Sequence, residues 1–591
     1  MMGNNLSATE NFQVTESLSP PAEVTEHAVR ISSSQVRFIK TSCISIVVFM
    51  GLLQAWIGAQ FFNPDGMCYV DVGRAFTSHH WRDAFNSYWS ALYSWILGVA
   101  LQVFSRSPQS QLPIVHAVNF LDYLFAFFCF SYFLRIAFST LRQSENANAN
   151  LEHLPEFALW IAANGIFLWA TLTQISVWDV TPDMLVAAMV YLIAATILQI
   201  RKTASLALFI KLGLLLGIGY WFKAVMFPLS FLFAFIACAA APRRQKRYLK
   251  TAVALLLFAV VSAPLATMLS IKDGRFTFGN SGWLNYSSYV SPGGRVRNWQ
   301  GQPAASGTPL HATRKVFANP DIFEFAQPIA GTYPPSDDPP YWNAGRKWTF
   351  SIRAQAGAIA HHLILYTNLF LLDQAGILVV VLALLFCAGR TREIFMAYWP
   401  LLAIMAGALG TYALVHVENR FLGAYIVLFW MALLLGVKLP SSTARNRLSQ
   451  YLLIAMAVSC LMSVAGDNYR LNRDSASYTA ALDLQVAKQL EAAGVHHGDQ
   501  IAMIGRGNWD YYAQFAGSKI IAEIMDQDTT TFWISSPELR TEVYRAFSGT
   551  GAIALVTRPP ATSLDPGWIK LGDTPYYMRW LQRTHALPTA P

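Results

Sequence analysis

Residues 41–71 read TSCISIVVFMGLLQAWIGAQFFNPDGMCYVD, an uncharged apolar segment followed by a short polar cluster. The apolar part, 41–62, is long enough to cross a bilayer as a helix. Three basic residues precede it and no small-residue cleavage site follows, so we expect an uncleaved anchor whose N-terminal end is cytoplasmic. The stretch predicts a membrane protein whose first acidic residue after this span, Asp65, lies just outside the bilayer.

The composition of the whole chain supports this class. Of the 591 residues, 54% are hydrophobic and only 13% are charged, whereas a soluble domain carries roughly 25% charged residues. The six cysteines form no CxxC pair, which argues against a disulfide scaffold and a zinc site. The net charge of +9 comes largely from short loops between apolar segments, so membrane lipids are the expected partner and nucleic acid is not.

Eleven apolar segments predict a mainly α, polytopic transmembrane helical bundle. They are 41–62, 112–136, 157–173, 183–200, 206–222, 225–241, 249–270, 374–389, 394–416, 421–437 and 449–465. Alternate connections are rich in Arg and Lys, whereas the short turns on the other side hold only Lys223 and Arg420, and this asymmetry places the basic connections in the cytoplasm. The apolar segment 91–104 is too short to cross, so we expect an interfacial helix there.

The predicted spans divide the chain into three regions. Residues 1–36 are polar and predict a disordered cytoplasmic tail. Residues 37–465 form the membrane module, with outer loops at 63–111 and 271–357. Residues 466–591 alternate helical and extended apolar stretches, which predicts a small extracytoplasmic α/β domain.

Two outer helix starts carry an acid behind a capping residue and a proline. Asn63-Pro64-Asp65 places the acid near the positive end of the helix dipole, and Thr181-Pro182-Asp183 repeats the pattern with Asp179 just before it. Each acid is therefore either a catalytic group or only part of a cap. Asp71 projects about 120° from Asp65 on a regular helix, which favours a supporting role, and its spacing from Arg74 also allows a simple ion pair.

Several cations lie on the side where the orientation rule disfavours them. Lys223 ends the fifth span, and His416, Glu418 and Arg420 share one tight outer turn. Lys223 either snorkels toward headgroups or binds substrate, and Arg420 either pairs with Glu418 or binds substrate. In the functional interpretation these cations hold a lipid-borne phosphate, because a guanidinium fork matches phosphate oxygens.

This arrangement resembles the GT-C class of integral membrane glycosyltransferases, which includes the protein O-mannosyltransferases and the bacterial lipid A aminoarabinose transferases. The resemblance covers about residues 40–465 and rests on the acid after the first span, the Thr-Pro-Asp start, the outer lysine and the soluble tail. The strings Asn63-Pro-Asp-Gly-Met-Cys-Tyr-Val-Asp71 and Gly331-Thr-Tyr-Pro-Pro-Ser-Asp-Asp-Pro-Pro-Tyr-Trp342 also resemble uncharacterised bacterial members. The class often has two adjacent acids in the first loop; here Gly66 follows Asp65.

The resemblance implies sugar transfer, with inversion, from a polyprenyl phosphate donor to an extracytoplasmic lipid, glycan or protein acceptor at a bacterial inner membrane. Asp65 would be the general base, with Asp71 in support. The implied donor phosphate contacts are Lys223, Arg420 and His416, and the other implied substrate contacts are Asp183, Glu418 and Tyr333. No dedicated metal cage is visible, so we expect no cofactor and metal-independent catalysis.

Two other classes of function are compatible with a polytopic chain. A transporter or lipid flippase usually carries ionisable residues near the bilayer midplane, whereas here they gather at one rim. A structural subunit would leave the positions of Asp65, Lys223 and Arg420 unexplained. The positions of the ionisable residues therefore favour an enzyme over a transporter and over a structural subunit.

Overall fold

The computed structural model describes residues 32–143, 151–243, 245–303, 306–388, 395–474, 480–560 and 564–582. Most of the predicted N-terminal tail, residues 1–31, lies outside these ranges. The first helix, α1 (Ser33–Ile57), begins before the predicted span because a capping box starts it. The Gln35 backbone N–H donates to Ser32 Oγ, and the Ser32 N–H donates to the Gln35 side chain.

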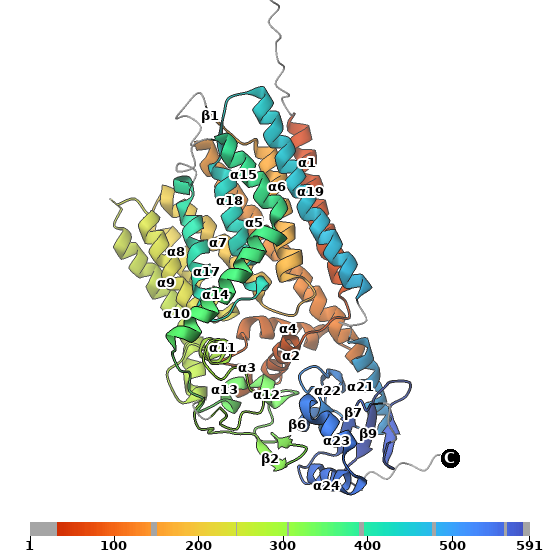
Figure 1. Ribbon diagram of the computed structural model, residues 1–591. Helices are drawn as coiled ribbons and strands as arrows, with labels where there is room; N and C mark the ends of the chain where they lie inside the picture. The colour runs from red at the N-terminus through yellow and green to blue at the C-terminus, as the bar shows by residue number, and fades with distance from the viewer. Residues whose placement is uncertain are drawn as a thin grey trace, which may run out of the picture.

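Long apolar helices form the body of the molecule (Figure 1). Seven described helices are long and apolar enough to cross a membrane: α1, α5 (Gln111–Gln143), α6 (Glu156–Trp169) with its π-helical end η3 (Ala170–Ile175), α7 (Asp183–Lys202), α10 (Arg247–Asp273), α18 (Asn419–Gly436) and α19 (Thr443–Arg473). An eighth consists of α14 (Ile352–Asn368), η5 (Leu369–Asp373) and α15 (Ala375–Ala388), bent by 79°. The chain is a multi-pass membrane protein.

Three shorter apolar helices correspond to further predicted spans: α8 (Leu206–Phe222), α9 (Met226–Ala240) and α17 (Trp399–Ala413). Counted with the eight above, they correspond to the eleven predicted segments, and the number that cross remains a prediction. The start of α14 is not predicted, because its first turns carry Arg353 and Gln355. The loop predicted at 271–357 is correspondingly shorter.

Burial distinguishes central from peripheral helices. In its most apolar window α7 is 89% buried, whereas α1 is only 17% buried and presents Phe49 and Trp56 outward. Apolar side chains on the outside of a helical bundle are expected where the solvent is lipid.

Two helices lie at the lower end of the bundle in Figure 1: α2 (Pro64–Thr77) and α4 (Ala91–Phe104). The second is the helix predicted from its short apolar run, with the same bounds. The two pack closely because each has a glycine at the crossing. A Cβ at Gly73 would overlap the Ser94 carbonyl, and a Cβ at Gly98 would overlap the Gly73 carbonyl.

A seven-stranded sheet lies beneath the bundle, in the order β2-β3-β6-β5-β7-β9-β8. Its strands are β2 (Arg314–Phe317), β3 (Ile322–Glu324), β5 (Gln500–Gly505), β6 (Lys519–Met525), β7 (Ala554–Thr557), β8 (Trp568–Lys570) and β9 (Tyr577–Trp580). Strand β5 runs parallel to β6 and β7, and the other pairs are antiparallel. With α21 (Ala481–Ala493) and α24 (Pro537–Ser548), the sheet confirms the predicted α/β character of the C-terminal region.

The sheet is not built from the C-terminal region alone, since β2 and β3 come from the loop between α10 and α14. The same loop contains α11 (Ser281–Tyr289), α12 (Pro334–Asp337) and α13 (Pro339–Trp342). The other short elements are α3 (Trp81–Ala84), η1 (Pro108–Ser110), α22 (Tyr512–Ala516), η6 (Asp526–Asp528), α23 (Thr529–Ile534), and the pair β1 (Leu151–His153) and β4 (Lys438–Pro440). The loop is therefore held between the bundle and the sheet.

Candidate active site

A cavity of about 660 Å³ lies where the bundle, α2 and the α10–α14 loop meet. It is lined by seven of the residues singled out in the sequence: Asp65, Asp183, Lys223, Tyr333, His416, Glu418 and Arg420. Aromatic side chains, among them Tyr88, Trp89 and Tyr289, form part of its wall. We call it the first cavity.

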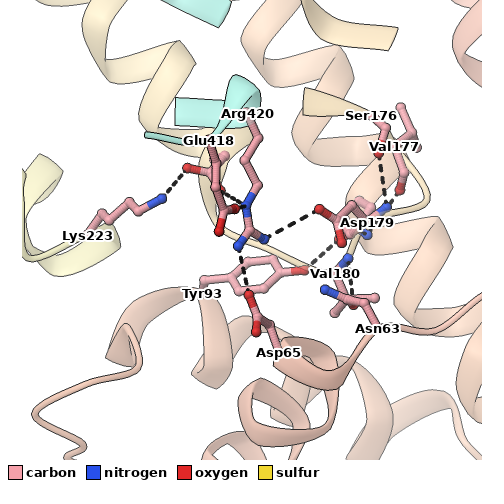
Figure 2. Close-up of polar contacts among 12 residues, drawn as sticks. Asn63, Asp65, Tyr93, Ser176, Val177, Asp179, Val180, Lys223, Glu418 and Arg420 are labelled. Atoms are coloured by element: carbon pink, nitrogen blue, oxygen red, sulfur yellow. Dashed lines mark hydrogen bonds and ion pairs between the residues drawn. The ribbon is translucent and has the colours of Figure 1, made fainter. Parts of the chain in front are cut away.

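The guanidinium of Arg420 is surrounded by four carboxylates, three of which (Asp65, Asp179 and Glu418) are labelled in Figure 2. Its Nε lies 2.6 Å from Glu418 Oε2 and 3.8 Å from Asp183 Oδ2. Its two Nη atoms lie 2.8 Å from Asp65 Oδ2 and 3.4 Å from Asp179 Oδ2. A fork with several N–H donors suits this role, so Arg420 holds acids from three separate chain segments together.

Helix starts place these groups. Asp65 lies in the first turn of α2 and Arg420 in the first turn of α18. The predicted cap geometry differs in detail: Asn63 occupies the N-cap of α2 without capping it, and its Oδ1 instead accepts from the Val180 N–H at 3.2 Å. At α7 the N-cap is Pro182 rather than Thr181, also without a side-chain cap. Asn63 therefore ties α2 to the turn that carries Asp179.

Lys223 points into the cluster. It forms an ion pair with Asp183, and its Nζ lies 3.7 Å from the centre of the Phe421 ring. Burial lowers the pKa of Lys223, and the Asp183 carboxylate opposes that shift. A buried ion pair of this kind does not fit a lysine that snorkels toward lipid headgroups.

His416 braces Glu418. Its Nε2 lies 3.0 Å from Glu418 Oε1, and its ring stacks on Tyr289 of α11 with centroids 3.8 Å apart. Burial alone would raise the pKa of Glu418, but the hydrogen bond from His416 and the charge of Arg420 lower it to about 2. At Asp179 the effect of burial is the larger one. Burial raises the pKa of this carboxyl to about 7, although the charge of Arg420 opposes the shift. The cluster thus combines an ionised acid with one that retains a proton near neutrality.

Asp71 does not line the first cavity. It is buried and accepts hydrogen bonds from the Thr332 N–H at 2.7 Å and from Gln514 Nε2 at 3.2 Å. Arg74 lies 3.7 Å away, as the spacing predicts for an ion pair, and burial raises the pKa of Asp71. Asp71 therefore links α2 to the loop and to the C-terminal region, and the structure does not bring it together with Asp65.

Tyr333 lines the first cavity, but its hydroxyl is engaged elsewhere. It donates to Glu523 Oε1 at 2.7 Å, and the same oxygen accepts from Asn298 Nδ2 at 2.7 Å. Glu523 lies on β6 and is fully buried. Tyr333 and Glu523 therefore connect the wall of the cavity to the sheet.

Sequence reasoning missed Arg295 as a site residue. It lines the first cavity, its side chain is exposed, and among the described residues it has no hydrogen bond or ion pair. It lies in the Pro292-Gly-Gly-Arg295 stretch, whose glycines predict only a turn. Asp179 carried a signal, since it makes the turn before α7 acidic beyond what a cap requires.

The described residues contain no group of three or more His, Cys, Asp or Glu arranged to hold a metal ion. Arg420 occupies the centre of the acidic cluster. The positive charge that these carboxylates face is therefore a guanidinium of the chain itself.

Solved structures resemble this one over nearly the whole chain. ArnT from Cupriavidus metallidurans bound to undecaprenyl phosphate superimposes with a TM-score of 0.56 at 12% identity, covering 93% of this chain and 99% of that one. The apo form of the same protein gives 0.54 at 11% identity, covering 92% and 98%. The Archaeoglobus fulgidus oligosaccharyltransferase in complex with zinc and sulfate gives 0.49 at 11% identity, covering 88% and 68%.

No protein-family model matches the chain, and no curated protein matches its sequence. The likeness in three dimensions is therefore the informative comparison, and at this identity it concerns the fold. ArnT is a lipid A aminoarabinose transferase of the GT-C class. The chain has the GT-C fold, a membrane helical bundle followed by a sheet-containing C-terminal region.

Proposed function

We propose that this chain is a membrane glycosyltransferase that moves a sugar from a polyprenyl-phosphate-linked donor to an acceptor hydroxyl, with inversion. One observation carries the proposal: a carboxylate, Asp65, lies on the wall of a large cavity that is also lined by Lys223 and Arg295. The fold supports it, since ArnT, which shares the fold, was solved with undecaprenyl phosphate bound. The basic connections predict that the cavity opens on the outer side of a bacterial inner membrane.

Asp65 serves as the general base in this proposal. One of its oxygens, Oδ2, accepts from Arg420, while Oδ1 has no donor among the described residues and is left for the acceptor proton. The acceptor oxygen attacks the anomeric carbon as its proton passes to Asp65. The bond from the anomeric carbon to the phosphate oxygen breaks, and its electron pair leaves with the polyprenyl phosphate.

The leaving phosphate needs cations that are not already neutralised. Arg420 faces four carboxylates and Lys223 is paired with Asp183, so we assign the phosphate contact to Arg295 and give Arg420 and His416 the task of positioning acids. Lys223, on the wall of the same cavity, adds positive charge whose only carboxylate partner among the described residues is Asp183. Charge-assisted hydrogen bonds from such groups stabilise the negative charge that develops on the phosphate.

The test is turnover by the purified full-length protein. We expect polyprenyl phosphate to be released from one member of a panel of polyprenyl phosphate sugars when envelope extract supplies the acceptor. Asp65→Asn keeps the side-chain shape and removes its basicity, so turnover should fall roughly a hundredfold while the melting temperature changes little.

The competing functions give different results. If wild-type protein moves the intact donor lipid across vesicles and releases no polyprenyl phosphate, it is a flippase and the proposal is wrong. If Asp65→Asn turns over at nearly the wild-type rate, Asp65 is only a helix-start residue. A base must then be sought elsewhere, beginning with Asp183.

A further inference from the structure

A second cavity, of about 680 Å³, lies against the same Asp65–Arg420 pair. Asp65, Glu418, Arg420 and Arg295 line both cavities, so the ion pair forms part of the wall between them. The remaining lining of the second cavity comes from the end of α1, Asn63 and Pro64 at the start of α2, residues 172–179 after α6, Asn419 at the start of α18, the end of α19 and the segment after β5. No role has yet been given to this space.

The two cavities differ in chemistry. The first is lined by six cations: Lys223, Arg275, Arg295, Arg297, Arg346 and Arg420. Among the described residues, the cations that line the second are the two shared arginines, against the carboxylates Asp65, Asp179, Glu418 and Asp467. An anionic phosphate is therefore favoured in the first cavity and disfavoured in the second.

The second cavity is rich in side-chain amides, which both donate and accept hydrogen bonds. They are Gln54, Asn63, Gln174, Asn419 and Asn508. Gln174 Oε1 is buried and has no partner among the described residues, so a donor is missing there. Gln54 and the side-chain oxygens of Asn63 and Asn508 already have partners within the chain. An uncharged ligand with many hydroxyl groups would supply donors for the carboxylates and for Gln174 Oε1.

Two tryptophans complete the lining, Trp178 within the cavity and Trp509 on the segment after β5. The Trp509 side chain is 52% exposed, so one face of its indole is open to a ligand in the cavity. A flat apolar ring beside polar hydrogen-bonding groups matches a pyranose, which has an apolar C–H face and a polar edge.

A peptide acceptor fits less well. Extended peptides are commonly held by a free strand edge or by apolar side-chain pockets. Within the described parts of the chain, no strand residue lines this cavity, and its aliphatic side chains are Leu172, Ile175 and Leu471. The cavity is lined by helix ends and loops. These do not present the regular row of backbone groups along which an extended peptide forms hydrogen bonds.

We propose that the second cavity binds the acceptor and that the acceptor is a saccharide. This inference rests on the proposed function. Its hydroxyl oxygen forms the new bond to the anomeric carbon of the donor, and the hydroxyl proton passes to Asp65. The bond from that carbon to the phosphate oxygen breaks, and polyprenyl phosphate leaves on the side of the first cavity. Attack from the second cavity, opposite the leaving group, gives inversion.

The experiment follows a radiolabelled sugar from the donor. Envelope extract from cells lacking this chain is separated into lipid-linked saccharide, soluble saccharide and protein, and each fraction is incubated with full-length enzyme and donor. We expect the label in a sugar-to-sugar linkage, and the fraction that takes it distinguishes a lipid-linked from a free saccharide. Label attached to a protein side chain would overturn the inference while leaving the proposed function intact. Donor that stays intact with every fraction would contradict the proposed function itself.

Variants locate the binding. Trp509→Ala should raise the KM for the acceptor fraction roughly tenfold and leave the donor KM unchanged. Trp348→Ala is the matched control, because Trp348 is 55% exposed and lines neither cavity; it should change neither constant. If Trp509→Ala leaves the acceptor KM at the wild-type value, or raises the donor KM instead, the second cavity is not the acceptor site.

Discussion

At the scale of single residues, the two arginines of the site differ in what they contact. Arg420 is 17% exposed and faces four carboxylates, whereas Arg295 is exposed and has no hydrogen bond or ion pair among the described residues. Removing a charge from within an ion-pair network leaves buried charges uncompensated. Removing an exposed, unpartnered charge affects only what binds to it.

Arg295→Met should therefore raise the donor KM about ten- to hundredfold, the usual size of a lost charge-assisted contact of about 1.5–3 kcal/mol, with an unchanged melting temperature. Arg420→Met should lower the melting temperature by several degrees. Donor kinetics and thermal denaturation of both variants in the same detergent give the comparison. If Arg295→Met unfolds early and Arg420→Met alters only the donor KM, the assignment of the phosphate contact to Arg295 is wrong.

The raised pKa of Asp179 predicts that the stability of the protein depends on pH. Burial raises its pKa from the usual acidic range to about 7 in the folded protein, so between about pH 4 and 7 the folded state binds a proton that the unfolded state does not. Its contribution to stability is thus fully present below the unfolded pKa and is lost as pH rises through 7. Asp179→Asn mimics the protonated form and should not lose this stability.

The measurement is the melting temperature of wild type and Asp179→Asn from pH 5 to 8. The difference between them should grow in favour of the variant by a few degrees as pH rises and should level off above pH 7. A constant difference across this range would show that Asp179 is ionised throughout.

At the scale of elements, hydrophobic periodicity and charge predict those helices and strands that bury a continuous apolar face. The helix at Ala91–Phe104 appears where its sequence predicts it, and the C-terminal region shows the predicted alternation, with strands at Gln500–Gly505 and Lys519–Met525 between its helices. The pairing of β3 with β6 was not predictable, because it joins Ile322 to Ile524 across a long stretch of chain through backbone hydrogen bonds that no local pattern records.

The candidate site likewise has features that the sequence predicts and features that it does not predict. Its charged residues could be found from position, since a carboxylate or cation at a membrane rim needs a reason. Their partners could not, because Arg420 meets Asp65 and Asp179 only after three helix starts converge. Arg295 gave no signal at all within a turn-like Gly-rich stretch.

A substitution of Tyr333 tests how its hydrogen bond to Glu523 holds the α10–α14 loop on the sheet. Tyr333→Phe removes the hydroxyl that donates to the buried Glu523 and should destabilise the protein by about 1–3 kcal/mol, with kcat and the donor KM close to wild type at a permissive temperature. Chemical denaturation and donor kinetics are measured in parallel. A raised donor KM at unchanged stability would instead support the direct substrate contact that the sequence predicts for Tyr333.

At the scale of the whole molecule, the site belongs to one end of the bundle. Helix α10 ends near the loop, where Lys272 Nζ lies 3.0 Å from Asp338 Oδ2. Its 27 residues extend about 40 Å, so Arg247 at its start lies at the other end. Helix α19 likewise runs from Thr443, next to β4, to Arg473, ahead of α21 of the C-terminal region. The two ends of these helices therefore report opposite faces of the membrane.

This geometry makes the predicted orientation testable. Because basic residues crowd the connections at the end away from the sheet, a reporter fused after Arg243 should be active only in its cytoplasmic form, and one fused after Asp474 only in its external form. The same signal at both sites would contradict the threading of the helices. Reversed signals would place both cavities on the cytoplasmic face. A donor and an acceptor presented outside the membrane could not reach Asp65 there, so the proposed extracytoplasmic transfer would be wrong.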